Sequence, residues 1–256
     1  MAKPAVKKAL HWSAFFVVCL LAASAFAEPC AMPATAQPVV NSYVIDGDTL
    51  VLTDQRRVRL IGIDAPEIGY RSQPSESFAR EARAELERVV RGAELRLLVG
   101  QQPKDKYGRT LGHLFADGVN VEALLLRSGL AFTVGIAPNL ALLDCHLQHE
   151  RLARQDKIGL WAHSPIQSAT GLKKSGFHVL RGQVTKVERT GRYFWLDLDG
   201  PITLRVASHD LHLFPDAANW AGRTVEVRGW VIERKPQRGR KRFMMPLLEP
   251  RLTTVD

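Results

Sequence analysis

The stretch IDGDTLVLTDQRRVRLIGIDAPE, residues 45–67, contains two apolar runs with acidic residues at their ends. Residues 49–53 are predicted to form one β-strand and residues 58–63 a second, with a turn between them. Pro66 ends the second run because proline cannot donate to a sheet ladder. Residues before the first strand and after the second lie at the same end of a hairpin. We therefore expect three acids to converge there: Asp48, Asp64 and Glu67.

Arg59 lies inside the apolar run VRLIGI of this hairpin. A charge in such a setting needs a partner to offset its desolvation, and the nearest candidates are the converging acids or an anionic ligand between them. Converging carboxylates also repel each other, and a cation relieves that repulsion. The sequence DGDT alone is typical of an ordinary turn. The acids therefore indicate a site only in combination with Arg59.

A second motif, DKYGR at residues 105–109, follows the hairpin. With this motif and the predicted helices in the same order, residues 40–163 resemble the staphylococcal nuclease (thermonuclease) family. The resemblance implies a mainly β fold with α-helices, an OB-type five-stranded barrel carrying three helices. It also implies hydrolysis of phosphodiester bonds in DNA and RNA, with products that carry a 3′-phosphate.

The resemblance assigns the acidic residues to a calcium site and to the activation of water. Asp48 and Asp64 would supply hard oxygen ligands to Ca²⁺, together with the backbone carbonyl of Ala65, which stands where the best-known members have threonine. Glu67 is the expected general base.

Two arginines would bind the phosphate and stabilise the charge of the transition state, namely Arg59 and Arg109. Tyr107 and Lys106 are expected to contact the substrate. The alternative for DKYGR is a local turn closed by an Asp105–Arg109 ion pair.

Residues 1–27 have the pattern of a secretory signal peptide: a basic start, a short apolar run and the small-residue sequence Ala25-Phe26-Ala27. Cleavage after Ala27 would leave no stable membrane partner, and we expect an exported protein, periplasmic or secreted. An uncleaved membrane anchor is the alternative. Export makes a Cys30–Cys145 disulfide plausible, with two unpaired thiols as its alternative.

The remaining elements are predicted from periodicity and from turn residues. Helices are expected at residues 74–90, 121–128 and 139–157, the last with an apolar stripe of leucines. Strands are expected at residues 94–99 and 110–115, separated by a polar loop at residues 101–109. Residues 28–39 are predicted to be an N-terminal arm and residues 164–175 a linker.

Residues 176–256 are predicted to form a second, smaller OB-like β-barrel with five strands, at residues 178–187, 193–198, 202–207, 224–234 and 242–254. This region carries 14 lysine and arginine residues against nine aspartate and glutamate residues. The basic sequence RKPQRGRKR fills its fourth turn, where we predict nucleic-acid contacts by Arg238, Arg240 and Lys241. A solvated basic loop beside a packed core is the alternative.

The whole chain has a net charge of +9, and removal of three leader lysines leaves the mature chain at +6. We predict an exported calcium-dependent nuclease acting on DNA and RNA. A non-catalytic nucleic-acid-binding module of two OB-type barrels is the alternative from another class. An envelope scaffold protein is a third interpretation, and it predicts no dependence on the acids.

Overall fold

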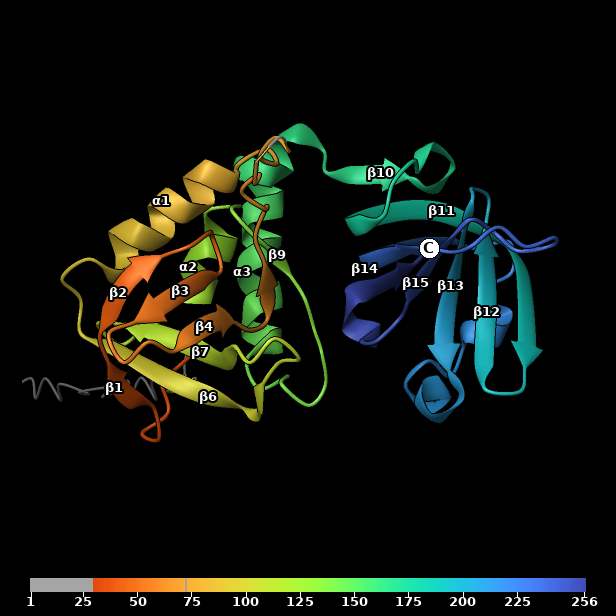
Figure 1. Cartoon of the computed structure of the whole chain (residues 1–256). Coiled ribbons are helices and arrows are strands. Elements are labelled where there is room, and N and C mark those ends of the chain that lie inside the picture. The colour runs from red at the N-terminus through yellow and green to blue at the C-terminus, as the bar shows by residue number, and fades with distance from the viewer. Residues whose placement is uncertain (1–29, 72) are drawn as a thin grey trace, which may run out of the picture.

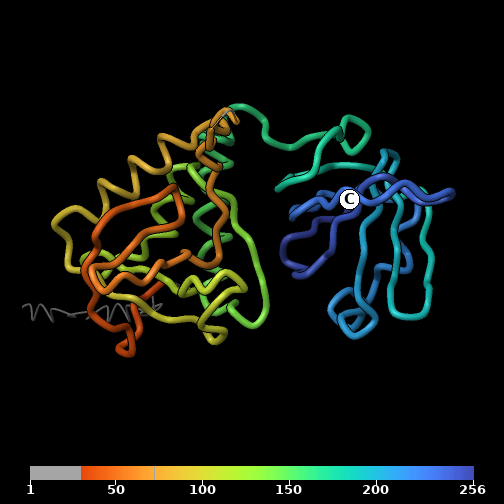
Figure 2. The backbone as a smooth tube through the Cα atoms, in the orientation of Figure 1, coloured from red at the N-terminus to blue at the C-terminus, as the bar shows by residue number. Residues whose placement is uncertain are grey.

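The computed structural model describes residues 30–71 and 73–256, which form two β-sheet domains (Figure 1). Figure 2 shows the chain leaving the first domain after its long C-terminal helix and entering the second. The predicted signal peptide, with its cleavage site, lies outside the described residues. No helix within those residues combines the length and the apolar character that a bilayer crossing requires.

The first domain is built on a sheet whose strands follow the order β1-β6-β7-β4-β3-β2. The edge strands β1 and β2 are separated in sequence by Val40 alone, so one stretch of chain runs along both edges of the sheet. Strands β4 and β7 pair in parallel, and the other pairs on this path are antiparallel. The strands are β1 (Gln37–Val39), β2 (Asn41–Val44), β3 (Thr49–Leu52), β4 (Arg57–Leu60), β6 (Leu95–Lys104) and β7 (Thr110–Ala116), with β8 (Val119–Asn120) attached to β7.

The second run of the hairpin was predicted as one strand but forms two. Strand β4 ends at Leu60, and β5 (Ile63–Asp64) pairs instead with β9 (Phe132–Thr133). Gly62 makes the break with a φ of 85°, a backbone conformation that glycine adopts at no steric cost. A Cβ at this position would also lie 2.3 Å from Nδ1 of His146. The change of direction carries Asp64 out of the main sheet.

Three helices cover the sheet: α1 (Ala79–Val90), α2 (Val121–Arg127) and α3 (Leu143–Gln155). Helix α1 begins later than predicted because Phe78 has a left-handed φ of 67°, which a helix cannot continue through. Helix α3 also begins late, because the Asn139 side chain accepts from and donates to the backbone of Gln102 on β6.

The apolar stripe predicted for α3 is only partly correct. Leu143 is buried but Leu152 is exposed, and the buried face includes the polar residues His146 and Glu150. The predicted polar loop at residues 101–109 is shorter than expected, because β6 continues to Lys104, which pairs with Thr110.

The second domain is a closed five-stranded barrel with the order β11-β12-β13-β15-β14 and a further pairing between β11 and β14. Strands β13 and β15 are parallel. When the first sheet is followed from β2 to β6, its strands have the same order as this barrel. The mainly β, OB-type fold class is confirmed. The strands are β11 (Gly176–Thr190), β12 (Tyr193–Leu198), β13 (Ile202–Ala207), β14 (Thr224–Glu233) and β15 (Phe243–Pro246).

Two segments of this domain differ from their predictions. The predicted linker contains β10 (Ile166–Ser168), which pairs with β11, and a 3₁₀ turn, η2 (Ala169–Gly171). Ala169 and Leu172 are buried in the core of the second domain. The strand predicted at residues 242–254 is divided into β15, the turn η5 (Pro250–Leu252) and β16 (Thr253–Val255). Pro250 causes part of this division because it has no N–H to donate.

Each domain has its own hydrophobic core, and the two meet along α3, β9, β11 and β14. Arg154 on α3 donates two hydrogen bonds to Glu226 on β14, at 2.6 and 2.9 Å. Phe132 on β9 stacks on Phe177 on β11, with ring centroids 5.4 Å apart. The remaining short helical turns are η1 (Gly159–His163), η3 (Ser208–Leu213) and η4 (Ala217–Asn219).

Candidate active site

Asp48 lies in the tight turn that leads into β3. Its N–H donates to the Asp46 carboxylate over 3.0 Å, an arrangement typical of aspartate in turns. Its carboxylate accepts from the Thr49 hydroxyl and from the Ala65 N–H, both at 2.9 Å. Asp48 is only 3% exposed, so the sequence places a carboxylate under the surface at the end of the hairpin.

Arg59 joins the two aspartates that the hairpin brings together. Its Nη2 donates to Asp64 over 2.8 Å, and its Nη1 contacts Asp48. Thr49 on β3 lies opposite Arg59 in the register of the two strands, which places the guanidinium at the end where both acids lie. Burial alone would lower the pKa of Arg59, but Asp48 and Asp64 raise it above its usual value. Arg59 therefore remains charged.

The two aspartates carry more negative charge than one arginine neutralises. Burial, helped by Asp46 and Asp64, raises the pKa of Asp48 to about 7 against the opposing effect of Arg59. Burial likewise raises the pKa of Asp64 to about 6, again against Arg59. Raised carboxyl pKa values of this kind are typical of acids that share a low-dielectric site. A bound cation would relieve the repulsion.

Glu67 follows β5 in an exposed position at the start of a loop. The loop is closed by two backbone contacts with Glu76: the Glu67 N–H donates to the Glu76 carboxylate, and the Glu76 N–H donates to the Glu67 carbonyl, each over 3.0 Å. Burial raises the pKa of Glu67, Asp46 raises it further, and Arg59 and Arg109 oppose the rise. Glu67 is thus coupled electrostatically to both arginines of the predicted site.

The DKYGR motif forms the turn between β6 and β7. The Asp105 carboxylate accepts from the N–H groups of Tyr107 and Arg109 at 2.9 Å, and from Nε of Arg109 at 2.7 Å. Although burial acts in the other direction, these bonds hold the pKa of Asp105 below its usual value. The local ion pair and the functional role of Arg109 are compatible, because Asp105 fixes the direction of the guanidinium.

The predicted substrate contacts Tyr107 and Lys106 are next to each other on the surface. Tyr107 is 73% exposed, with the Lys106 ammonium 4.9 Å from its ring centroid and the Arg109 guanidinium 5.7 Å away. A hollow of about 340 Å³ beside them is lined by the side chains of this turn and of residues 54–57. Arg56, Arg57, Lys104 and Arg109 line the hollow against one acid, Asp54, which pairs with Arg56, so its net positive charge suits a phosphate chain.

Sequence reasoning missed two acids of this region, Asp46 and Glu76. Asp46 raises the pKa values of Asp48 and Glu67, and its place in the DGD turn was a usable signal. Glu76 raises the pKa values of Asp64 and Glu67. It had no sequence signal, since only the path of the loop brings it back to Glu67.

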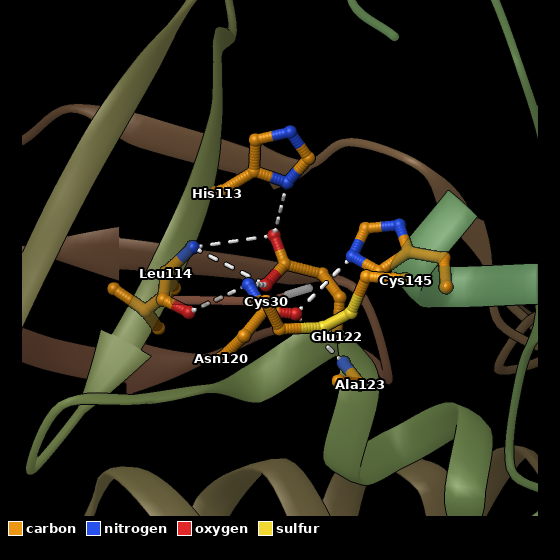
Figure 3. The surroundings of a disulfide bond; sticks show 8 residues. Cys30, His113, Leu114, Asn120, Glu122, Ala123 and Cys145 are labelled. Carbon is orange, nitrogen blue, oxygen red and sulfur yellow. Dashed lines mark hydrogen bonds and ion pairs between the residues drawn. A yellow bond between two sulfur atoms is a disulfide. The ribbon is translucent and has the colours of Figure 1, made fainter. Parts of the chain in front are cut away.

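The structure joins Cys30 to Cys145, on α3, by a disulfide with a Cα–Cα distance of 5.5 Å. Figure 3 shows the polar cluster beside it, in which His113, Asn120 and the Leu114 N–H all contact the Glu122 carboxylate. Glu122 is fully buried, and its contacts satisfy both carboxylate oxygens. This cluster accounts for one of the buried polar residues of α3, because His146 joins it through a hydrogen bond with Asn120.

Of the predicted contacts in the second domain, Arg238 and Arg240 are exposed in the basic loop. Lys241 differs, since its ammonium donates to the carbonyls of Leu198 and Gly200 at 3.2 and 2.9 Å. Its side chain therefore ties the loop to the β12–β13 turn. None of the three lies in the acid and arginine cluster of the first domain.

The donor set of that cluster fits a hard divalent cation. Asp48 offers a buried carboxylate and Asp64 a partly buried one, with more negative charge than Arg59 balances, and such cations prefer oxygen ligands. The Ala65 group in contact with Asp48 is its N–H, so the carbonyl ligand remains an expectation from the resemblance. Among the described residues, the tightest groups of three potential ligands lie elsewhere, at His113–Glu122–His146 and Cys30–Cys145–His149.

The first domain combines an OB-type sheet with two aspartates around one arginine, an exposed glutamate and a second arginine. These groups define a class of protein that is suited to act on phosphate esters. The family model described as staphylococcal nuclease homologue matches residues 57–163. The chain is 31% identical over 121 residues to a thermonuclease of Staphylococcus intermedius, covering 46% of this chain and 72% of that protein. The chain belongs to the staphylococcal nuclease family.

Two further relatives match a similar length of this chain. An uncharacterized protein of Bacillus anthracis is 34% identical over 125 residues, which is 47% of this chain and 58% of that protein. The endonuclease YncB of Bacillus subtilis is 30% identical over 131 residues, which is 49% of this chain and 62% of that protein. These matches each cover about half of this chain.

Proposed function

We propose that the protein is an exported, calcium-dependent nuclease that hydrolyses phosphodiester bonds in DNA and RNA. The observation that carries this proposal is the electrostatic cluster of Asp48, Arg59, Asp64, Glu67 and Arg109, in which each acid has a raised pKa. The names of the relatives, a thermonuclease and an endonuclease, support the same reaction class.

In this proposal Glu67 takes a proton from the attacking water. Its exposed position gives water access, and its raised pKa brings it closer to neutrality, where a general base works best. Water oxygen bonds to phosphorus and the bond from phosphorus to the 5′ oxygen breaks. The products are a 3′-phosphate and a 5′-hydroxyl, and the leaving oxygen takes up a proton.

The arginines stabilise the additional negative charge on the phosphate oxygens in the transition state. Arg109 is oriented for this by Asp105, and its planar fork suits two phosphate oxygens. Arg59 is held between Asp48 and Asp64, where it contributes a fixed positive charge. Asp48, Asp64 and the Ala65 carbonyl would hold Ca²⁺, which supplies charge neutralisation at the phosphate when bound.

Export is supported by the leader pattern of residues 1–27 and by the Cys30–Cys145 disulfide, a bond that persists in oxidising compartments. N-terminal sequencing of protein recovered outside the cytoplasm tests it. A start at Glu28 is expected, and a start at Met1 would contradict cleavage.

Digestion of plasmid DNA tests the reaction, with calcium and with chelator, beside a Glu67→Gln variant. Cutting should require the metal, and Glu67→Gln should reduce the rate by roughly 10²–10⁴-fold, the usual contribution of a general base. Calcium should raise the melting temperature of both proteins, which shows that the variant still folds and binds metal. A wild type that binds DNA tightly without cutting it would favour the non-catalytic binding module instead.

A further inference from the structure

The outer face of the second barrel carries aromatic rings on β12. Along this strand Phe194 and Leu196 point into the core, while Tyr193 and Trp195 are only half-buried on the other side. The two rings are in an edge-to-face arrangement with centroids 5.5 Å apart. The indole N–H of Trp195 donates to the hydroxyl of Thr190 over 2.8 Å. Both rings are therefore held in place on the outside of the barrel.

Each of these rings has an arginine over it. Arg205 on β13 lies 4.8 Å from the centroid of the Tyr193 ring, and Arg234 lies 5.7 Å from that of Trp195. Arg234 also donates to the carbonyl of Lys241, which fixes its position. Guanidinium planes and aromatic rings are both surfaces on which nucleobases stack.

Four described arginines of this domain pair with carboxylates: Arg228 with Glu150, Arg251 with Glu249, Arg181 with Asp256 and, at the end of the β14–β15 loop, Arg242 with Glu233. A second group lies on or beside the aromatic face and makes no ion pair within the described part of the chain. Its members are Arg192, Arg205, Arg234, Arg238 and Arg240. Positive charge left without acidic partners is available to an anion.

The loops that border this face are also basic. The β14–β15 loop lines an open hollow of about 470 Å³ with Arg234, Lys235, Arg238 and Arg240, and the β11–β12 turn contains Arg192 next to Tyr193. In OB-type barrels the face of the second and third strands and these two loops are the surfaces that bind oligonucleotides. The second and third strands here are β12 and β13. Two acids also lie on this side of the barrel: Asp197, the next outward residue of β12, and Glu188, which is opposite Trp195 in the β11–β12 register and pairs with Lys186.

We propose that this face, defined by Tyr193, Trp195, Arg205, Arg234 and the β14–β15 loop, binds single-stranded nucleic acid. Bases stack on the two rings and their arginines, and the loop arginines contact the phosphates. A duplex does not expose its bases and so cannot use the rings. The face lies outside the proposed catalytic cluster and binds without cleavage, so it does not depend on the proposed reaction. Its effect in a nuclease is to hold single strands close to the cutting domain.

Fluorescence anisotropy of the full chain with a labelled oligothymidylate of about 16 nucleotides, the upper site size of one OB fold, tests this. Chelator prevents metal-dependent cutting, so the result is separate from the outcome of the digestion experiment. Trp195→Ala and Tyr193→Ala should each weaken binding by roughly 5- to 100-fold, which is the usual effect of removing one stacking ring. Trp195→Phe keeps a ring and should retain most of the affinity.

Salt dependence tests the phosphate contacts. The double change Arg238→Ala and Arg240→Ala should reduce the slope of log affinity against log salt by about 0.7 for each phosphate that the protein no longer neutralises. Arg181→Ala removes a charge that is already paired with Asp256 and should leave both the affinity and the slope unchanged. Melting curves from circular dichroism identify any variant that fails to fold.

Three results would overturn the proposal. One is unchanged oligonucleotide affinity in a folded Trp195→Ala protein. Another is equal competition by a duplex of the same length, because that would mean charge alone determines binding. Binding to vesicles of anionic phospholipid, with none to the oligonucleotide, would likewise reject a nucleic-acid face.

Discussion

Arg228 of the second barrel donates to Glu150 on α3 of the first domain, and the side chains of both are less than 10% exposed. The same Glu150 carboxylate accepts from the Thr133 N–H on β9 over 2.8 Å. One buried ion pair thus connects the strand beside Asp64 to the second barrel. The two domains are joined by more than the chain segment between them.

Removal of Arg228 is expected to destabilise the protein, because it leaves a buried carboxylate without its cation. Arg228→Ala should lower the unfolding free energy by about 3–5 kcal/mol, the usual cost of breaking such a pair. Urea denaturation followed by fluorescence measures this. The exposed pair of Arg83 and Glu87 on α1 provides the control, and Arg83→Ala should cost less than about 1 kcal/mol. Equal losses of unfolding free energy in the two variants would show that the buried pair contributes no more to stability than the exposed one.

The disulfide is expected to contribute to stability. It closes a loop across 115 residues, and a bond over so long a segment restricts the unfolded chain strongly. Reduction should therefore lower the unfolding free energy of a protein that begins at Glu28 by about 2–4 kcal/mol. The comparison is a melting curve with and without reductant. A double variant, Cys30→Ser with Cys145→Ser, should be insensitive to the reductant, and sensitivity there would point to another cause.

Much of the site could be predicted from the sequence because it is local. Asp48, Arg59 and Asp64 all lie in one hairpin and the turns at its ends, and alternation in two adjacent strands suffices to bring them together. Strands β12 and β13 also have their predicted bounds, and the burial of β12 alternates along its whole length.

The features that the sequence did not reveal depend on distant contacts. Residues 164–175 have the composition of a linker, yet Ala169 and Leu172 are buried by a core that forms from the rest of the second domain. Helix α3 was expected to bury leucines, but Glu150 is buried by its ion pair with Arg228, 78 residues later. Glu76 comes close to Glu67 only through the path of a loop. None of these contacts leaves a periodic pattern in the sequence.

Acid is expected to destabilise the fold through His146. Burial, together with the neighbouring His113 and His149, lowers the pKa of this histidine from 6.5 to about 3. The folded protein therefore keeps His146 neutral, whereas the unfolded chain protonates it below pH 6.5. Its contribution to stability is complete above that pH, decreases as the pH falls below it, and continues to decrease until about pH 3. The slope is about 1.4 kcal/mol per pH unit.

The measurement is the unfolding free energy between about pH 7 and pH 4 for wild type and His146→Gln. Glutamine does not titrate and can still donate to Asn120. The unfolding free energy of the variant should therefore fall less steeply with decreasing pH, by the slope that corresponds to about one proton. Asp48 and Asp64, whose raised pKa values act in the opposite direction and lose their contribution as pH rises, are the same in both proteins and cancel. His209→Gln, at a side chain that is 83% exposed, should keep the wild-type slope. An unchanged slope in His146→Gln would mean that this histidine is not the acid-sensitive group.

Asp105 is expected to affect catalysis through the orientation of Arg109. It holds the turn through two backbone N–H groups and holds Arg109 through Nε. Asp105→Asn preserves an oxygen for the turn but removes the charge that fixes the guanidinium. The rate of DNA cleavage at saturating calcium should fall by about tenfold in this variant. Arg109→Ala removes the guanidinium itself and should cost roughly 10²–10³-fold, as for the removal of one donor to a transition state.

The single and double variants together distinguish a role of Asp105 in positioning Arg109 from a purely structural role in the turn. If Asp105 served only to stabilise the turn, Asp105→Asn would retain full activity wherever it remains folded. If it oriented Arg109, combining Asp105→Asn with Arg109→Ala would reduce the rate no further than Arg109→Ala alone, because the group being oriented is absent. We expect the second result. Additive losses in the double variant would show that Asp105 acts on the reaction independently of Arg109.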